Sequence, residues 1–283
     1  MHKTRVFLLS LYLVVPYIQS AIAAEEYIFT APPRGTAAAE TKTYAPIAEY
    51  LSAATGKKIV YKYPDNWLTY QKEMQTGQYP LVFDGPHFIS WRMQHSQHEP
   101  IAQLPGKLAF VLATSATDKR FTDISQLAGR PICALAPPNL ATLTMQSKFT
   151  NPARQPLIIE VPSFGEGYKQ MLAGKRCVAV VMRDKLFKKL NGEKKAAQVI
   201  WSSKGVANQG FSAGPQFTPE DKRKMQKALL APEAKTAITG FLDRFSKGNK
   251  QLESATYEDY RGLSELLKGV WGFDVQSVAA HTQ

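Results

Sequence analysis

Two arginines occupy positions from which a guanidinium could bind an anion. Arg34 follows the β-prone run Glu26–Thr30 inside a turn that contains proline and glycine, and Arg183 comes almost directly after the apolar run 177–181. A guanidinium can bind carboxylate, phosphate or sulfate through two parallel hydrogen bonds. The alternative is a loop arginine that faces solvent, as most charged loop residues do.

A second group of candidates surrounds the end of another predicted strand, residues 81–83. Asp84 and His87 flank Gly85 and Pro86 there, and either side chain could hydrogen-bond a ligand. Because histidine has an ordinary pKa near 6.5, His87 would add positive charge only under acidic conditions.

Aromatic side chains lie near the same predicted strand ends. Trp67 comes just after the turn at 64–66, and Phe88 follows His87. Such rings either form stacking walls for a ligand or belong to the core of a lobe. Asn66 either contacts a ligand or caps the following helix with its side-chain oxygen.

The elements that would position these residues alternate between strand and helix. The predicted strands are 26–30, 58–63, 81–83, 131–136, 157–161 and 177–181, and the helices between them are 43–55, 67–75, 139–149 and 166–173. The run 108–114 is expected to cross between two such units, and further helices are predicted at 219–229, 235–245 and 257–269. This alternation with short connections predicts parallel sheets covered by helices, in which ligands bind beyond the carboxyl ends of the strands.

Two such units predict an α/β protein of two lobes with a ligand cleft between them, joined by two strands that act as a hinge. In this prediction the first lobe comprises residues 25–114 and 205–283, and the second lobe comprises residues 115–204. A length of 283 residues and an apolar content of 44% fit two folded lobes and exclude a mostly disordered chain.

The first 23 residues have the pattern of an export signal. Lys3 and Arg5 precede an almost unbroken apolar run over 6–18, and Ala21-Ile22-Ala23 gives the small-x-small pattern of a cleavage site. The apolar run is short for a transmembrane helix, and an uncleaved anchor is the alternative. We therefore expect cleavage near Ala23 and an exported protein.

Basic residues exceed acidic ones, 35 against 23, for a formal net charge of +12. Such a surplus attracts anions over long range. The basic residues are scattered, and no aromatic-interleaved basic stripe, helix-turn-helix or RNP-type signature accompanies them. Nucleic acid is therefore not expected as a partner.

The two cysteines begin the first and third strands of the second unit, which are commonly neighbours in doubly wound sheets. In an oxidising compartment we expect Cys133 and Cys177 to form a disulfide, with a thiol site for a soft metal as the alternative. His95 and His98 stand three residues apart on a predicted helix, but no acidic or Cys partner completes a set. We expect a solvated helix end there, no metal site and no cofactor.

Six further features occur in a fixed order along the chain: 65–67 (DNW), 77–86 (GQYPLVFDGP), 123–130 (DISQLAGR), Gly174 before 177–181, 218–221 (TPED) and 257–260 (YEDY). This ordered set resembles the phosphate/phosphonate-type periplasmic substrate-binding proteins of ABC importers, which implies a periplasmic location. The resemblance covers nearly the whole chain after the signal. It implies the type II periplasmic-binding-protein fold and a solute receptor that works with a membrane permease.

The second lobe departs from the family pattern at the expected ligand positions. Where the family has a hydroxyl-rich turn after the strand, residues 136–142 read Ala-Pro-Pro-Asn-Leu-Ala-Thr, with Asn139 and Thr142 as the polar members. Phe164 stands where the family often has histidine, and Met182 stands at an acidic position that binds the amino end of phosphonates. The resemblance therefore places ligand contacts at these four residues and argues against an aminophosphonate.

The sequence as a whole predicts a monomeric, non-enzymatic binding protein that captures a small, anionic solute for an ABC permease. The expected ligand contacts are Arg34, Asn66, Trp67, Asp84, His87, Phe88, Asn139, Thr142, Phe164, Met182 and Arg183. One alternative keeps the fold and hands a signal to a membrane histidine kinase or cyclase. The other is an exported enzyme, although no nucleophile elbow, Walker A or H-E-x-x-H motif is present.

Overall fold

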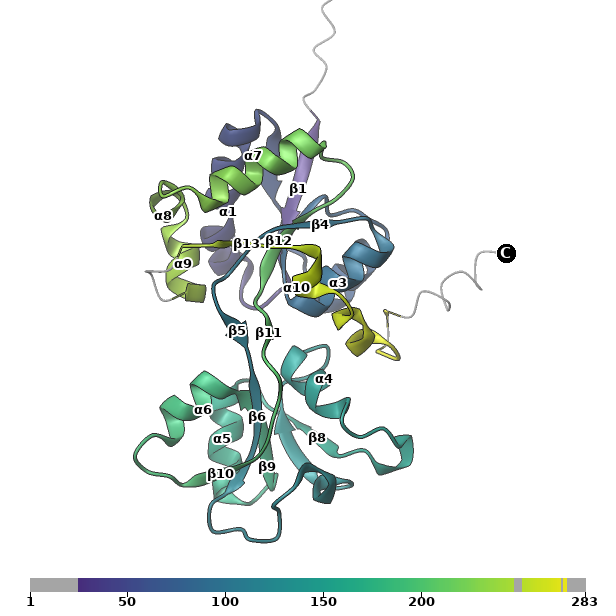
Figure 1. The fold of residues 1–283 in the computed structure, drawn as a ribbon, viewed down its shortest axis with the longest axis vertical. Helices are drawn as coiled ribbons and strands as arrows, with labels where there is room; N and C mark the ends of the chain where they lie inside the picture. The colour runs from purple at the N-terminus through teal and green to yellow at the C-terminus, as the bar shows by residue number, and fades with distance from the viewer. Residues whose placement is uncertain (1–24, 247–250, 271, 274–283) are drawn as a thin grey trace, which may run out of the picture.

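The computed structural model describes residues 25–246, 251–270 and 272–273, which form two lobes with a separate β-sheet in each (Figure 1). The predicted α/β fold of two lobes is confirmed. The predicted signal peptide, residues 1–23, lies outside the described residues. Within the described ranges, no helix is long and apolar enough to cross a membrane.

The first lobe is built on a six-stranded sheet in the order β13-β4-β12-β3-β1-β2. Its strands are β1 (Glu26–Thr30), β2 (Lys58–Tyr61), β3 (Leu81–Asp84), β4 (Glu99–Gln103), β12 (Gly210–Ala213) and β13 (Glu253–Ser254). β1 pairs in parallel with β2 and β3, whereas β12 is antiparallel to both β3 and β4. The carboxyl ends of β1 and β3 therefore reach one edge, from which the segments with Arg34 and His87 leave.

The helices after the parallel strands begin at side-chain or glycine caps. α1 (Ala37–Thr55) starts earlier than the predicted residue 43 because the Thr36 hydroxyl accepts a hydrogen bond from the Ala39 amide, 3.4 Å away. α2 (Trp67–Gln75) has the predicted bounds, and the Asn66 side chain caps it by accepting from the Thr69 amide at 2.9 Å. α3 (Pro86–His95) follows Gly85, which offers no capping side chain.

The helices of the last third are shorter than predicted, apart from α7 (Pro219–Leu230). The predicted helix 235–245 is divided into α8 (Ala234–Ala237) and α9 (Thr239–Ser246). The predicted helix 257–269 is divided into α10 (Tyr257–Tyr260) and the 3-10 helix η3 (Leu263–Leu267). Gly262 separates these two with a φ of 78°, a left-handed conformation that cannot continue a helix.

The second lobe is built on a five-stranded sheet in the order β10-β6-β9-β7-β8. Its strands are β6 (Phe110–Ser115), β7 (Pro131–Ala134), β8 (Leu157–Glu160), β9 (Ala179–Arg183) and β10 (Ala197–Ser202). Its helices are η1 (Ile124–Leu127), α4 (Leu140–Gln146), η2 (Pro152–Arg154), α5 (Phe164–Ala173) and α6 (Asp184–Asn191). β7 is parallel to β8 and β9, so the segments that leave these strands meet at one edge, as in the first lobe.

Two short antiparallel strands, β5 (Lys107–Leu108) and β11 (Val206–Ala207), connect the lobes (Figure 1). The chain enters the second sheet at β6, which pairs with β9 and β10. Residues 110–114 were predicted in the first lobe, whereas these hydrogen bonds join them to the second sheet. We therefore propose that the second lobe starts at Phe110.

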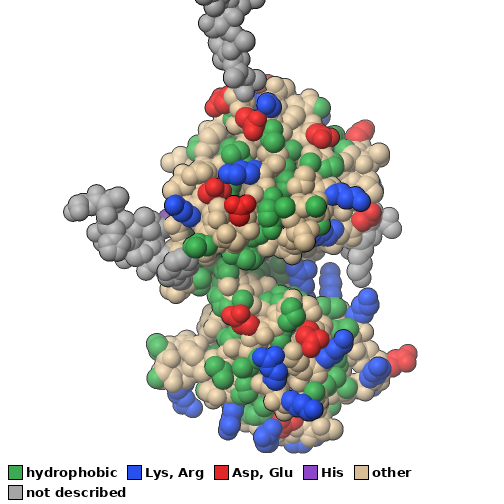
Figure 2. All heavy atoms as spheres, turned by 180° about the vertical axis from the view of Figure 1, so that it is seen from behind, with side chains coloured by type: hydrophobic (Ala, Val, Ile, Leu, Met, Phe, Trp, Pro, Cys, Tyr) green, Lys and Arg blue, Asp and Glu red, His purple; other side chains and the backbone are tan. Residues whose placement is uncertain are grey.

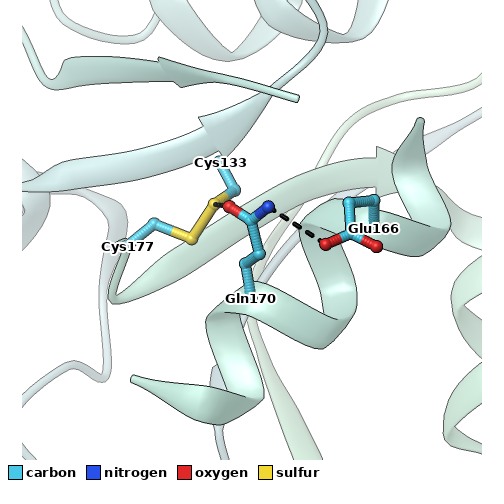
Figure 3. Close-up of a disulfide and its surroundings, with 4 residues drawn as sticks. All are labelled: Cys133, Glu166, Gln170 and Cys177. Carbon is cyan, nitrogen blue, oxygen red and sulfur yellow. Dashed lines mark hydrogen bonds between the residues drawn. A yellow bond between two sulfur atoms is a disulfide. The ribbon is translucent and has the colours of Figure 1, made fainter. Parts of the chain in front are cut away.

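The predicted disulfide between Cys133 and Cys177 is confirmed (Figure 3). Cys133 lies in β7, Cys177 lies just before the neighbouring β9, and their Cα atoms are 5.6 Å apart. The side chain of Gln170 reaches over from α5, with its amide nitrogen donating to a carboxylate oxygen of Glu166 at 3.1 Å. The disulfide therefore joins two adjacent strands beneath the helix that packs on them.

Candidate ligand-binding site

A cavity of about 510 Å³ lies between the lobes. The first lobe contributes Pro33, Arg34, Trp67, Gly85, Pro86, His87 and Phe88. The second lobe and the crossing segments contribute Leu108, Phe110, Leu135, Ala136, Pro137, Pro138, Asn139, Leu140, Ala141, Pro162, Phe164, Arg183 and Gln209. Most of these residues leave the carboxyl ends of β1, β3, β7, β8 and β9, which is the edge where the alternating topology predicts a ligand.

Arg34 enters the cavity from the turn after β1. Its Nη1 atom donates to the Tyr44 hydroxyl at 3.4 Å, and its guanidinium carbon lies 5.8 Å from the ring centre of Phe83 and 5.9 Å from that of Phe245. Aromatic faces attract a guanidinium through their negative quadrupole. These contacts hold the cation at the cavity wall.

Arg183 enters from the opposite lobe, at the end of β9 and the start of α6. Desolvation within the cavity and the positive charge of Arg34 both lower the pKa of Arg183 from its ordinary value. Both guanidinium groups line the same cavity, so their positive charges face one ligand space. An anion between them would relieve their mutual repulsion.

His87 links the two lobes. Its ring is 3% exposed, stacks on Phe88 at a centroid distance of 4.1 Å, and has Nε2 2.9 Å from the carbonyl oxygen of Pro138 in the second lobe. Burial lowers the pKa of His87 to about 4, so the ring is neutral and its Nε2–H donates to that carbonyl. Gly85 makes room for this arrangement, because a Cβ there would lie 2.8 Å from Cε1 of His87.

The start of α3 adds to the positive potential of the cavity. Gly85, Pro86, His87 and Phe88 all line it, so the amino-terminal end of the helix dipole faces the ligand space. No side chain caps this end. A helix start of this kind favours a negative charge beside it.

Apolar rings form much of the remaining wall. Trp67 is 38% exposed, and its ring centre lies 6.2 Å from that of Phe88, which is buried against the first lobe. Phe164 and Phe110 contribute from the second lobe. Phe110 and Gln209 were missed by the sequence analysis because they come from crossing segments rather than from the loops after parallel strands.

Four predicted contact residues do not line the cavity. Met182 is fully buried among second-lobe side chains, because adjacent residues of β9 point to opposite faces. Asn66 caps α2, and the Thr142 hydroxyl donates to the carbonyl of Leu135 at 2.6 Å. Asp84 is fully buried inside the first lobe. Asn139 does line the cavity, while its side chain also caps α4.

Asp84 belongs to a buried polar cluster that joins α2, β3 and α3. One carboxylate oxygen accepts from Nε of Arg92 at 2.9 Å and from the Tyr70 hydroxyl at 2.5 Å, and Arg92 Nη2 also contacts that hydroxyl at 3.0 Å. The guanidinium and the carboxylate are both almost fully buried. Asp84 is thus occupied by an ion pair within the first lobe.

The described residues that line the cavity include no aspartate or glutamate. Its charged side chains are Arg34 and Arg183, and its neutral polar side chains are His87, Asn139 and Gln209. A ligand ammonium group would therefore find no carboxylate there, whereas an anion would find two guanidinium groups.

His95 and His98 were predicted to lie together on a solvated helix end, and the prediction is wrong for His98. α3 ends at His95, and His98 is not on a solvated helix end but is buried with Nδ1 3.2 Å from the Ser212 hydroxyl. The described part of the chain contains no group of three or more His, Cys, Asp or Glu side chains that could hold a metal ion.

The two lobes and the cavity between them define a ligand-binding protein of the periplasmic-binding-protein class. Residues 29–260 match the model of the family described as the phosphonate periplasmic substrate-binding proteins of ABC transporters. The chain belongs to this family, which confirms the resemblance found in the sequence and the assignment as a substrate-binding protein. It is a family of binding proteins rather than of enzymes. A search of curated protein sequences found no match.

Solved structures with the same fold share little sequence with this chain. PhnD1 from Prochlorococcus marinus in complex with methylphosphonate is 13% identical, with 87% of this chain and 98% of that chain covered and a TM-score of 0.63. XAC2383 from Xanthomonas citri bound to ATP is 11% identical, with 91% and 99% covered and a TM-score of 0.65. A binding protein component of an ABC phosphonate transporter from Pseudomonas aeruginosa is 11% identical, with 86% and 85% covered and a TM-score of 0.58.

Proposed function

We propose that this protein captures a small organic anion of the phosphonate class in the cavity between its lobes and presents it to an ABC permease. The observation that carries the proposal is the pair Arg34 and Arg183, which reach one cavity from opposite lobes, with no acidic side chain among its described lining residues. A phosphonate or similar oxyanion can accept hydrogen bonds from both guanidinium groups at once. Binding would therefore also draw the lobes together.

The walls favour a ligand with an apolar substituent and no amine. Trp67, Phe88, Phe110 and Phe164 line the cavity with aromatic rings that suit the organic part of the anion, and the described lining residues include no carboxylate for an ammonium group. Two structural neighbours are in complex with ligands that carry phosphonyl or phosphoryl oxygens, methylphosphonate and ATP. The same oxyanion chemistry suits the two arginines here.

We propose export through cleavage near Ala23, action in the periplasm and binding as a monomer, with one ligand per chain. The family's periplasmic setting and the basic, apolar and small-residue order of residues 1–23 support export.

Thermal unfolding of the mature chain tests the ligand class. Phenylphosphonate and methylphosphonate are each expected to raise the melting temperature, because a ligand that binds only the folded state stabilises it by about 2.7 kcal/mol at one hundred times its Kd. We expect 2-aminoethylphosphonate to have a much smaller effect. A panel of phosphonates, phosphate, sulfonates and carboxylates that leaves the melting temperature unchanged would contradict the proposal.

A further inference from the structure

The positive charge of this protein is concentrated in the second lobe. Residues 110–204 contain 15 Lys+Arg and 6 Asp+Glu, whereas residues 25–109 and 205–283 together contain 18 and 17. Nearly the whole surplus of the exported chain therefore belongs to one lobe. Figure 2 shows Lys and Arg side chains spread over the visible face of the lower lobe with few acidic ones, while the upper lobe has both signs.

Within the second lobe, the basic side chains gather on the outer side of α5 and α6. These helices pack on the same face of the sheet, with the ring centres of Tyr168 and Phe187 6.3 Å apart and the Tyr168 hydroxyl 3.0 Å from the Asn191 side chain. The helices and the turns after them carry eight exposed basic residues. They are Lys169, Lys175, Arg176, Lys185, Lys188, Lys189, Lys194 and Lys195, and we refer to them as the α5–α6 basic face.

The charges of the α5–α6 basic face are mostly unpaired. In the part of the chain that the structure describes, Lys188 is the only member in an ion pair, with Asp184 at 2.8 Å. By contrast, α7 in the first lobe has basic residues matched by nearby acidic ones, such as Lys224 with Glu220 at 2.9 Å and Lys222 with Glu99. An unpaired, single-sign surface attracts a partner of opposite charge.

We propose that the α5–α6 basic face docks on an anionic membrane surface, with acidic phospholipid headgroups as its partner. Seven of its eight members are lysines on flexible stems, spread along two helices and two turns rather than gathered around a pocket. This diffuse pattern matches a laterally continuous layer of negative headgroups, to which polybasic surfaces are attracted. Leu172, 37% exposed on the same side of α5, adds an apolar contact at that interface.

Docking by this face leaves the ligand cavity free. The first residue of α5, Phe164, and the residue before α6, Arg183, both line the cavity, so the helices start at the ligand site. Lys185 is in the first turn of α6, whereas Lys175, Arg176, Lys194 and Lys195 follow the opposite ends of these helices. A protein held by this face could exchange ligand and meet a permease while it diffuses along the membrane. The inference rests on the proposed export and is independent of what the cavity binds.

Vesicle co-sedimentation tests the proposal with the mature full chain. We expect binding to vesicles of phosphatidylcholine with 30% phosphatidylglycerol at 50 mM NaCl, no binding to phosphatidylcholine alone, and loss of binding at 500 mM NaCl because exposed charges are screened. The triple variant K169E/K185E/K189E should lower the bound fraction at least tenfold. A matched triple variant in the first lobe, R223E/K227E/K235E, changes the net charge equally and should bind nearly as well as the wild type.

No binding of the wild type to the anionic vesicles, or an equal loss in both triple variants, would overturn the proposal. If the vesicles are not bound but the first triple variant impairs solute uptake in cells, the basic face serves the permease instead and the membrane proposal is wrong. Circular dichroism of both variants shows whether a loss of vesicle binding is due to misfolding. The shift in melting temperature with phenylphosphonate tests the proposed ligand class separately from docking.

Discussion

At the scale of single residues, the cavity is defined by two cations that repel each other when no anion lies between them. Arg34 is held by the Tyr44 hydroxyl and two aromatic rings, and Arg183 stands at the junction of β9 and α6. The protein therefore keeps an unfavourable charge pair at its ligand site. Such a pair costs folding stability and increases affinity for an anion.

The substitution Arg183→Met should separate these two effects. We expect phenylphosphonate to bind at least tenfold more weakly, because a charge-assisted hydrogen bond contributes about 1.5–3 kcal/mol. The melting temperature of the ligand-free variant should not fall, since the substitution removes a repulsion from Arg34. Titration calorimetry gives the affinity and calorimetric scans give the stability. Arg130→Met, at an exposed second-lobe position outside the cavity lining, is the control and should bind normally.

His87 should make the folded state sensitive to acid. Burial holds its pKa at about 4, with Asp84 and Arg34 exerting opposing electrostatic effects, while the unfolded chain has the ordinary value near 6.5. The unfolded state therefore takes up a proton first as the pH falls from 6.5 towards 4, and stability is lost in that window. Relative to His87→Gln, wild type should lose about 1 kcal/mol more between pH 7.5 and 5.5.

Urea unfolding at the two pH values measures this difference. The buried His98 titrates in both proteins, so the comparison isolates His87. His95→Gln is the comparison, because burial also lowers the pKa of that partly exposed ring but less than that of His87, so this variant should lose only a smaller part of the wild-type pH dependence. Equal pH dependence in wild type and His87→Gln would show that His87 is not held neutral by burial.

At the scale of elements, local signals predicted α2 but not the start of α1. Asn66 and Gly77 mark the limits of α2, and its bounds agree with the prediction. α1 begins six residues before the predicted start, where the sequence is rich in alanine and has no apolar periodicity. Glu40 in this turn is buried because it pairs with Arg244 at 2.7 Å, a residue 204 positions away. No local pattern reveals such a contact.

The candidate site was predictable where it depends on topology and not where it depends on side-chain direction. Arg34, His87 and Phe164 reach the cavity because they follow the carboxyl ends of strands. Asp84 and Met182 belong to strands themselves, and the alternation of side chains along each strand turns both away from the cavity. Arg92, the partner of Asp84, lies eight residues away, and no local pattern indicates a buried ion pair there.

The disulfide between β7 and β9 should account for a measurable part of the second lobe's stability. It closes a loop with a sequence separation of 44 residues, for which the chain-entropy model gives about 3–4 kcal/mol. The double variant Cys133→Ala/Cys177→Ala should therefore unfold at lower urea concentration, while phenylphosphonate still binds at low temperature. Thiol titration of the unreduced wild type should find no free thiol, and two free thiols would refute the bond.

At the scale of the whole molecule, the lobes touch beyond the hinge and the cavity. Leu143 of α4, 6% exposed, packs into a first-lobe cluster with Phe88, Trp91, Leu267 and Phe273. Leu266 of η3 packs in turn against the second-lobe core. Together with the hydrogen bond from His87 to the Pro138 carbonyl, these contacts stabilise the approach of the two lobes.

If ligand binding requires this approach of the lobes, Leu143→Ala should weaken binding although Leu143 does not line the ligand cavity. Burial of a leucine side chain contributes about 1.5–3 kcal/mol, so we expect phenylphosphonate affinity to fall about tenfold or more. Leu157→Ala is the matched control, because Leu157 is 58% exposed on β8 of the same lobe, and its affinity should equal that of the wild type. Calorimetry measures both affinities, and X-ray scattering with and without phenylphosphonate should show a smaller radius of gyration on binding. Unchanged affinity in Leu143→Ala, with an unchanged radius in the wild type, would mean that the lobes do not close on the ligand.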